Sequence, residues 1–370
     1  MKLTSALFAL ASCLWMVGCS KSSITDNIDV YGYWVMENDG SIMKDPQPSG
    51  LKAWKGGLLT VSDRSAIPSQ RLLLRKISTN EAQLNGPDLS ISLSDNLAQS
   101  CFAAYISGNP DLEALAIDPN DDKIFYLVTE DASGAEPMSV SCQNKYSNTG
   151  STLYPRLLIR LEQQTSSSVL MTHVRPIKFT QEMQVGDFPN DGIEALSFGN
   201  NRTLYLGVEK DKQSQARIFS LKMDEDFWGS EDFAVVSDLP LKLPNFSGGR
   251  HPINGMDFYQ APAGQEFLIA AARNDGKLWI IDLSGEKETR ILPLTFYAEL
   301  KSGSENCTGF EKMHNASIEG VAVMNDTLWM VNDPWKEMYI KNIQCNENKE
   351  NYENYSPLLF SLKIQAEWFQ

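Results

Sequence analysis

Hydrophobic and polar positions along the chain recur in a segment that returns at a near-constant spacing. Each copy has an apolar residue, an acid, small or apolar residues, a short gap, and then an aliphatic and aromatic run that ends in another acid. The leading apolar positions are 51, 112, 193, 256 and 318, so the spacings are 61, 81, 63 and 62 residues. A near-fixed period indicates a repeat architecture, and the repeated unit here consists of β-strands.

Further strand-like runs bounded by Gly, Pro, Asn and Asp lie between the copies, about four per repeat. Four-stranded sheets repeated radially are typical of a β-propeller, so we expect an all-β propeller of five or six blades. The last repeat is one strand short. We predict that residues 28–36 (IDVYGYWVM) supply the missing strand and close the ring. A pair of β-sandwiches is the alternative, which accounts less well for a period that persists throughout the chain.

The first residues are typical of an export signal. Lys2 is followed by an apolar run that ends in Val17-Gly18-Cys19, and a short apolar region ending in small residues is typical of a secretory signal peptide. The ending resembles the bacterial lipobox, which implies an outer-membrane lipoprotein anchored through lipid, including palmitate, on Cys19 and facing the periplasm or the cell surface. An ordinary signal with a chance cysteine is the alternative. Residues 1–18 are then the signal, 19–27 a tether and 28–370 one propeller domain.

Cysteines and charge narrow the choice of compartment and partner. Cys101, Cys142, Cys307 and Cys345 remain once Cys13 and Cys19 are set aside, and four cysteines in an oxidising compartment predict two disulfides. We favour Cys101–Cys142 and Cys307–Cys345, because each pair flanks one repeat and closes a long insertion. The net charge of −15 argues against nucleic acid as a partner.

The repeat brings acidic side chains together at one place. The two strands of each copy are consecutive and antiparallel, so the start of the first and the end of the second lie at the same end of the sheet. In a propeller these ends gather around one mouth of the central channel. A ring of carboxylates and amides suits Ca²⁺, although the same acids also suit structural turns. In the first copy Lys52 takes the acidic position. The candidate metal ligands are Glu113, Glu130, Glu194, Glu209, Asp257, Glu319 and Asp333.

The motifs LEALA, IEALS and IEGVA, each followed by a strand ending YLVTED, YLGVEKD or WMVNDP, resemble the phytase-like propeller proteins of bacteria. The resemblance implies calcium held near the axis, at Glu113, Glu194, Asp257 and Glu319, and hydrolysis of phosphoesters or esters. A D-x-P-A-I-W type segment of alkaline phytases is not found in the chain, which counts against phytate as the substrate.

Candidate catalytic residues lie on the loop that enters the fourth copy. Arg250 and His251 precede it, and Arg273 ends its second strand. The arginines suit a phosphate or carboxylate and the histidine suits proton transfer, although ordinary loop hydrogen bonds are the simpler interpretation of His251. No G-x-S-x-G motif is present. We therefore expect a propeller that binds a small anionic ligand or a protein at a calcium-containing mouth. The alternative is a calcium-dependent phosphoesterase or esterase of phytase-like type.

Overall fold

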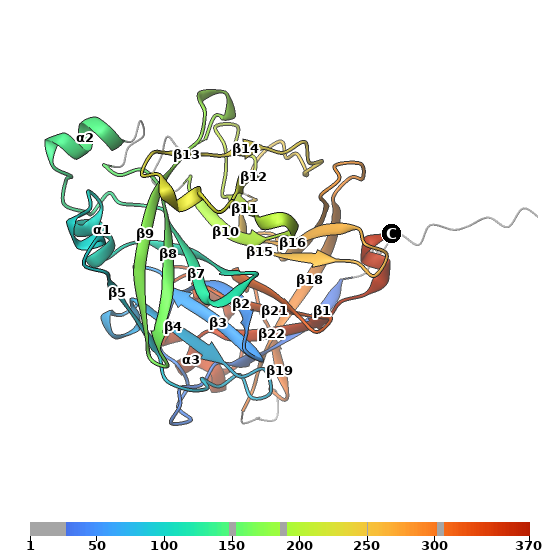
Figure 1. Cartoon of the computed structure of the whole chain (residues 1–370). Helices are drawn as coiled ribbons and strands as arrows, with labels where there is room; N and C mark the ends of the chain where they lie inside the picture. Colours follow the sequence, from blue (N-terminus) through green and yellow to red (C-terminus); the bar gives the residue numbers. More distant parts are fainter. Residues whose placement is uncertain (1–26, 148–152, 186–190, 250, 302–306) are drawn as a thin grey trace, which may run out of the picture.

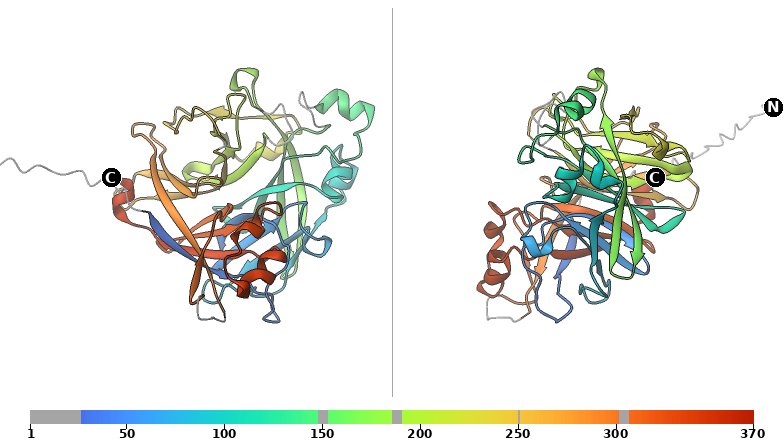
Figure 2. Two further views of the ribbon diagram at one scale, coloured as in Figure 1. Left: turned by 180° about the vertical axis from the view of Figure 1, so that it is seen from behind. Right: turned by 60° about the vertical axis from the view of Figure 1, so that its left-hand side comes forward.

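A computed structural model describes residues 27–147, 153–185, 191–249, 251–301 and 307–370. The strands of these residues form antiparallel arrays of four (Figures 1 and 2), which follow one another along the chain. Array 1 contains β2 (Pro48–Trp54), β3 (Gly57–Ser62), β4 (Leu73–Ile77) and β5 (Leu89–Leu93); array 2 contains β6 (Leu112–Asp118), β7 (Asp121–Thr129), β8 (Leu157–Thr165) and β9 (Ser168–Lys178); array 3 contains β10 (Ile193–Phe198), β11 (Thr203–Val208), β12 (Arg217–Lys222) and β14 (Ser237–Asp238); array 4 contains β15 (Ile253–Gln260), β16 (Glu266–Ala272), β17 (Lys277–Asp282) and β18 (Arg290–Glu299); array 5 contains β20 (Ile318–Met324), β21 (Thr327–Asn332), β22 (Leu358–Lys363) and β1 (Ile28–Trp34).

The arrays are arranged in a ring, which gives an all-β, propeller-like fold. The first strands of neighbouring arrays contact each other in sequence, β2 with β6, β6 with β10, β10 with β15, β15 with β20, and β20 again with β2. The N-terminal strand β1 pairs antiparallel with β22, so the beginning of the chain completes the array formed by its end. This is the closure predicted for residues 28–36.

Apolar side chains fill the space between successive arrays. Leu59 of array 1 shares a buried cluster with Phe125 of array 2, and Leu51 shares another with Val331 of array 5. Equivalent clusters lie between the other neighbouring arrays. Every array is therefore covered on both faces, which explains why its central strands are apolar at nearly every position rather than at alternate ones.

The outer edges of the arrays are also largely paired. β5 pairs in parallel with β9, and β18 pairs in parallel with β1, so the open edges of two pairs of neighbours protect each other. The apolar segment over residues 232–241 is divided between two sheets. Its first part, β13 (Ala234–Val235), pairs with β9, and β14 pairs with β12. The small strand β19 (Phe310–Lys312) pairs with β18.

Helices in the described residues are short and lie at the periphery (Figure 2). None of them is long and apolar enough to cross a bilayer. Disulfides join Cys101 to Cys142 and Cys307 to Cys345, as predicted, and disulfides of this kind are typical of proteins outside the cytoplasm. The α-helices are α1 (Ala103–Ser107), α2 (Val140–Tyr146) and α3 (Lys349–Glu353), and single 3₁₀ turns occupy Pro68–Gln70, Leu97–Gln99, Gln181–Met183, Asn200–Arg202, Phe227–Gly229, Tyr339–Asn342, Asn346–Asn348 and Ala366–Phe369.

Candidate functional site

Each inner strand of the ring begins with the same irregularity. After the first residue pair the register shifts, and one residue is left out of the ladder. A bulge of this kind re-aims the side chain that it carries. The residues left out are Ser49, Glu113, Glu194, Asn254 and Glu319.

The residue after each bulge is small because the inner strands approach closely there. A Cβ at Gly255 would lie 2.8 Å from the carbonyl oxygen of Glu319, and a Cβ at Gly50 would lie 2.8 Å from the backbone nitrogen of Leu115. Arrays 2 and 3 have alanine at this position, at Ala114 and Ala195. The tight ring therefore fixes the polar residue that stands just before each small one.

Three of the five bulge residues bring their carboxylates together. One oxygen from each of Glu113, Glu194 and Glu319 lies within 4.8 Å of the others. All three side chains are buried, and Glu319 is only 3% exposed. These acids come from arrays 2, 3 and 5, so residues far apart in the sequence meet at one mouth of the ring, as the repeat predicted.

A second layer of acids surrounds this trio. Glu130, at the end of β7, lies within 4.8 Å of Asp111 and Glu113 as one group and of Glu194 and Glu209 as another. One of its oxygens accepts a hydrogen bond from the backbone nitrogen of Gly192 at 2.8 Å. A Cβ at Gly192 would overlap the Glu130 side chain, so glycine is needed for this approach.

Crowding perturbs the acid–base properties of these carboxyl groups. Burial, followed by the neighbouring acids, raises the pKa of Glu113 and Glu194 well above the usual range. Burial and the charges of Asp111 and Glu209 raise the pKa of Glu130 to about 8, and burial raises that of Asp111 to about 6. Like charges and loss of water both disfavour the ionised form.

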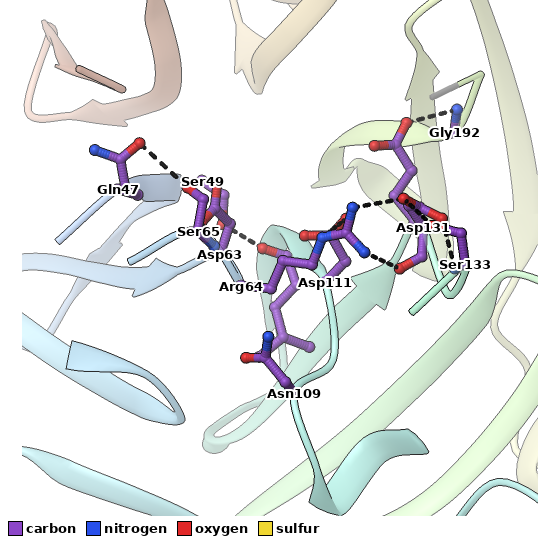
Figure 3. A network of polar contacts seen from close by, with 12 residues as sticks. Gln47, Ser49, Asp63, Arg64, Ser65, Asn109, Asp111, Asp131, Ser133 and Gly192 are labelled. Carbon is purple, nitrogen blue, oxygen red and sulfur yellow. Dashed lines mark hydrogen bonds and ion pairs between the residues drawn. The ribbon is translucent and has the colours of Figure 1, made fainter. Parts of the chain in front are cut away.

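Basic side chains compensate the acids at the rim. Arg64 lies 3.2 Å from Asp111 and 2.5 Å from Asp131 (Figure 3). Arg273 lies 2.5 Å from Glu319 and 2.8 Å from Asp333. Burial works against the charge of Arg273, but these two acids outweigh it and raise its pKa.

The two central acids that remain, Glu113 and Glu194, differ from their neighbours. Over the described ranges, neither makes an ion pair with a basic side chain. Glu194 accepts a hydrogen bond at 3.1 Å from the Asn254 side-chain nitrogen. The Asn254 side-chain oxygen is buried and has no hydrogen-bond partner among the residues that the structure describes, and the whole residue is 1% exposed.

The positions of Asp257 and Lys52 correct the sequence alignment. Asp257 was expected among the acids of the mouth, but it lies opposite Ile269 within the ladder. Its carboxylate is 2.8 Å from the Lys52 ammonium group. The repeat was aligned three residues too late in the first and fourth copies, where the bulge residues are uncharged.

The Lys52–Asp257 pair links strands from several arrays. The Lys52 nitrogen also donates to the carbonyl oxygens of Met256 and Val321. The carboxylate of Asp257 accepts from the Ser197 hydroxyl at 2.9 Å and from the Val323 backbone nitrogen at 2.7 Å. Since every polar atom of this pair has protein partners, the role of Asp257 is structural: it is the ion-pair partner of Lys52.

The structure limits the catalytic candidates. Arg250 lies outside the described residues, and Arg273 holds Glu319 and Asp333. The His251 ring stacks on Phe246 with centroids 3.6 Å apart. Its Nδ1 is 2.8 Å from Asp275, and its Nε2 is 3.0 Å from the carbonyl oxygen of Gly248. Both ring nitrogens therefore face acceptors, which is the arrangement of a hydrogen-bonded loop residue.

The sequence pattern placed Asn254 before the motif as a further oxygen donor, but did not recognise that Asn254 and Ser49 are equivalent to the motif acids. The shared signal is an apolar residue, a polar residue and then Gly or Ala, present as PSG, LEA, IEA, ING and IEG at residues 48–50, 112–114, 193–195, 253–255 and 318–320. Requiring an acid in the second place excluded Ser49 and Asn254. A search for the small third residue would have found both of them.

Comparisons with known proteins give distant likenesses in fold. No family model matches the chain, and no curated protein matches it. A PQQ-bound aldose sugar dehydrogenase from Streptomyces coelicolor is 12% identical, with 85% of this chain and 93% of that chain covered and a TM-score of 0.38. A GH43 β-1,3-galactosidase is 8% identical, with coverage of 90% and 94% and a TM-score of 0.47. An exo-β-1,3-galactanase from Clostridium thermocellum is 11% identical, with coverage of 91% and 66% and a TM-score of 0.45. Likenesses at this level carry no inference about activity.

Proposed function

We propose that this chain is a lipid-anchored envelope protein with a five-bladed propeller whose acidic channel mouth binds a divalent cation, Ca²⁺, and with it a ligand or protein partner. The blade number is supported by the five clusters that separate successive arrays and by the pairing of β1 with β22. The anchor is supported by the lipobox-like sequence before Cys19 and by the two disulfides.

The observation that carries the cation site is the convergence of Glu113, Glu194 and Glu319. Calcium takes oxygen ligands at about 2.4 Å, so ligands on opposite sides of one ion are ~4.8 Å apart. The three carboxylate oxygens all lie within 4.8 Å of one another, which is compatible with a shared ion.

The donor set also fits a hard cation. All three acids supply oxygen, and the Asn254 side-chain oxygen supplies a neutral one that is buried and has no other partner within the described part of the chain. Oxygen-only sites with mixed carboxylate and amide ligands favour calcium over zinc or copper. A bound dication would also relieve the repulsion that raises the pKa of Glu113 and Glu194.

The remaining coordination positions give the site its proposed use. Four protein oxygens are fewer than the six to eight that calcium takes, so an anionic ligand or a partner's carboxylate completes the shell. Trp335 borders the same mouth, because the Arg273 guanidinium lies 5.8 Å from its ring, and its side chain is 39% exposed. It offers an aromatic surface to whatever binds there.

Binding is favoured over hydrolysis. A hydrolase of phytase-like type needs a group that transfers a proton and a basic group that binds the anionic substrate, and the candidates that the sequence indicated for these roles are His251 and Arg273. His251 is committed to Asp275 and Gly248, and Arg273 is committed to two acids. We therefore retain the calcium-dependent hydrolase only as the alternative outcome of the experiment below.

Isothermal titration of the full mature chain with Ca²⁺ tests the cation site. Binding by the wild type, with loss in both Glu113→Gln and Glu194→Gln, supports the proposal; equal binding by all three chains refutes it. Assays of phosphoesters and esters with and without Ca²⁺ separate the alternative, because turnover that Glu194→Gln abolishes indicates an enzyme. Mass analysis of the mature N-terminus tests the anchor independently.

A further inference from the structure

An exposed cluster of aromatic rings lies on the outer sheet where the domain begins. Tyr31 and Tyr33 of β1 are 43% and 48% exposed. The Tyr31 ring stacks on Tyr297 of β18 with centroids 5.2 Å apart, and its edge meets Phe310 of β19 at 4.9 Å. Phe310 also contacts Tyr33 at 5.8 Å. We call these four side chains the aromatic patch.

The packing of β1 explains why the tyrosines point outward. Val30 and Trp34 are buried, and a Cβ at Gly32 would lie 2.4 Å from the Phe360 ring. Because side chains alternate along a strand, Val30, Gly32 and Trp34 face the core, and Tyr31 and Tyr33 lie on the opposite face. Packing alone does not require large aromatic side chains there, because both are nearly half exposed.

The patch lies next to the proposed anchor. Eight residues, 20–27, lie between Cys19 and Ile28, where β1 begins, and the nine Cα–Cα steps across them span at most ~30 Å when fully extended. The patch starts three residues further on, at Tyr31. A short tether keeps a neighbouring surface at a high effective concentration relative to the bilayer, so even weak contacts are populated.

The chemistry of the patch suits a lipid surface. Tyrosine is enriched where protein meets lipid headgroups, because its ring is apolar and its hydroxyl remains hydrated. Lys301 and Lys312, on the hairpin formed by β18 and β19, are exposed, and they offset the exposed Asp29 and the partly buried Glu299. The exposed charges beside the patch are therefore of both signs.

We propose that the aromatic patch docks on the bilayer surface and fixes the orientation of the propeller on its membrane. The proposal rests on the anchor proposed at Cys19. It adds that the domain is seated on lipid through Tyr31, Tyr33, Tyr297 and Phe310, rather than tumbling freely on its tether.

Hydroxyl-radical footprinting of the full mature chain tests this docking. The protein is reconstituted in vesicles of phosphatidylethanolamine and phosphatidylglycerol, and a protease site within residues 20–27 allows the same folded chain to be released. Oxidation of the patch is compared between anchored and released chains by mass spectrometry. Val140, on α2 at the other side of the molecule in Figure 1, is 74% exposed and serves as the internal control.

We expect oxidation of the patch to be roughly threefold or more lower in the anchored chain, because docked rings are shielded from water, while Val140 is unchanged. In Tyr31→Ser/Tyr33→Ser the protection of Tyr297 and Phe310 should be lost, whereas Val140→Ser should keep it. Equal oxidation in both states overturns the proposal. Protection that appears only on adding a saccharide also overturns it, because a glycan is then the occupant. Protection that appears only as the protein concentration rises overturns it as well, because the occupant is then a second copy of the chain.

A separate measurement distinguishes failure of the proposed lipidation at Cys19 from failure of the proposed docking. A mature chain whose mass shows no acyl group refutes lipidation, and co-sedimentation of that chain with the same vesicles then tests the patch. Vesicle binding that Tyr31→Ser/Tyr33→Ser removes supports the patch, and no binding overturns it. Thermal unfolding of each variant shows whether the fold is retained.

Discussion

Replacing Glu194 by glutamine should have opposite effects on the calcium-free and calcium-bound protein. Glu194 lies within 4.8 Å of Glu113 and Glu319, and also of Glu130 and Glu209 in a second group. Two unit charges 4.8 Å apart repel by about 3 kcal/mol at an effective dielectric constant of ~20. Shared protons relieve part of this repulsion, so removing one acid should stabilise the calcium-free protein by roughly 1–3 kcal/mol near pH 8. Glutamine keeps an oxygen to accept the bond from Asn254.

The second part of the prediction concerns the rise in Tm when calcium is added. A ligand at 100 times its Kd stabilises the folded state by about 2.7 kcal/mol. For some 340 residues, an unfolding entropy of ~2.1 cal/mol/K per residue converts this to a rise in Tm of about 4 °C. We expect this rise in the wild type and its near-complete loss in Glu194→Gln.

Differential scanning calorimetry at pH 8, with calcium or with chelator, measures both effects. The matched control is Glu311→Gln, because Glu311 is a buried acid remote from the trio and accepts bonds from Cys345 and Asn348. That variant should have a lower Tm in both conditions with an unchanged calcium shift. A Glu194→Gln protein that behaves like this control would refute the reasoning, since Glu194 would then be an ordinary structural acid.

Three further outcomes follow. The pKa of Glu130 is raised to about 8 and that of Asp333 to about 7, so the folded state binds more protons than the unfolded state above pH ~4. The Tm of the calcium-free protein should therefore fall as the pH rises from 5 to 8, and the increase in Tm caused by calcium should become larger. A Tm that does not change with pH would contradict this. Lys52→Met leaves Asp257 buried without its cation and should cost about 3–5 kcal/mol in urea unfolding, whereas Lys52→Met/Asp257→Leu should recover much of that loss. Replacing Cys101 and Cys142 by serine opens a loop with a separation of 41 residues, which should cost ~4 kcal/mol by the loop-entropy model; a loss below ~1 kcal/mol would be evidence against it.

Much of the fold could be predicted from the sequence because the repeated apolar pattern reflects the same packing in every array. Every array buries both faces against its neighbours, so its central strands are apolar and easily recognised, as in KIFYLVT and EFLIAAA at residues 123–129 and 266–272. The segment 28–36 was identified as the closing strand because the last repeat was incomplete. The cysteine pairing followed from the same division into repeats.

The candidate site was predicted less completely, because its geometry depends on a backbone irregularity. The bulge lets Glu113, Glu194 and Glu319 converge, but no strand propensity encodes it. What the sequence does encode is the small residue that follows. Alignment by acidic residues placed Asp257 at the mouth, whereas close packing of Gly255 against β20 puts Asn254 there. The pairing of Arg273 with Glu319 depends on contacts between arrays that no local pattern reveals.

The convergence of three glutamates on one cation is tested most directly by diffraction from crystals soaked in Ca²⁺ or a heavier analogue, read as an anomalous difference map. We predict a single strong peak about 2.3–2.6 Å from carboxylate oxygens of Glu113, Glu194 and Glu319, with the Asn254 oxygen turned toward it. A map without a peak at this position, with the three carboxyl groups bonded only to one another and to Arg273, would contradict the account.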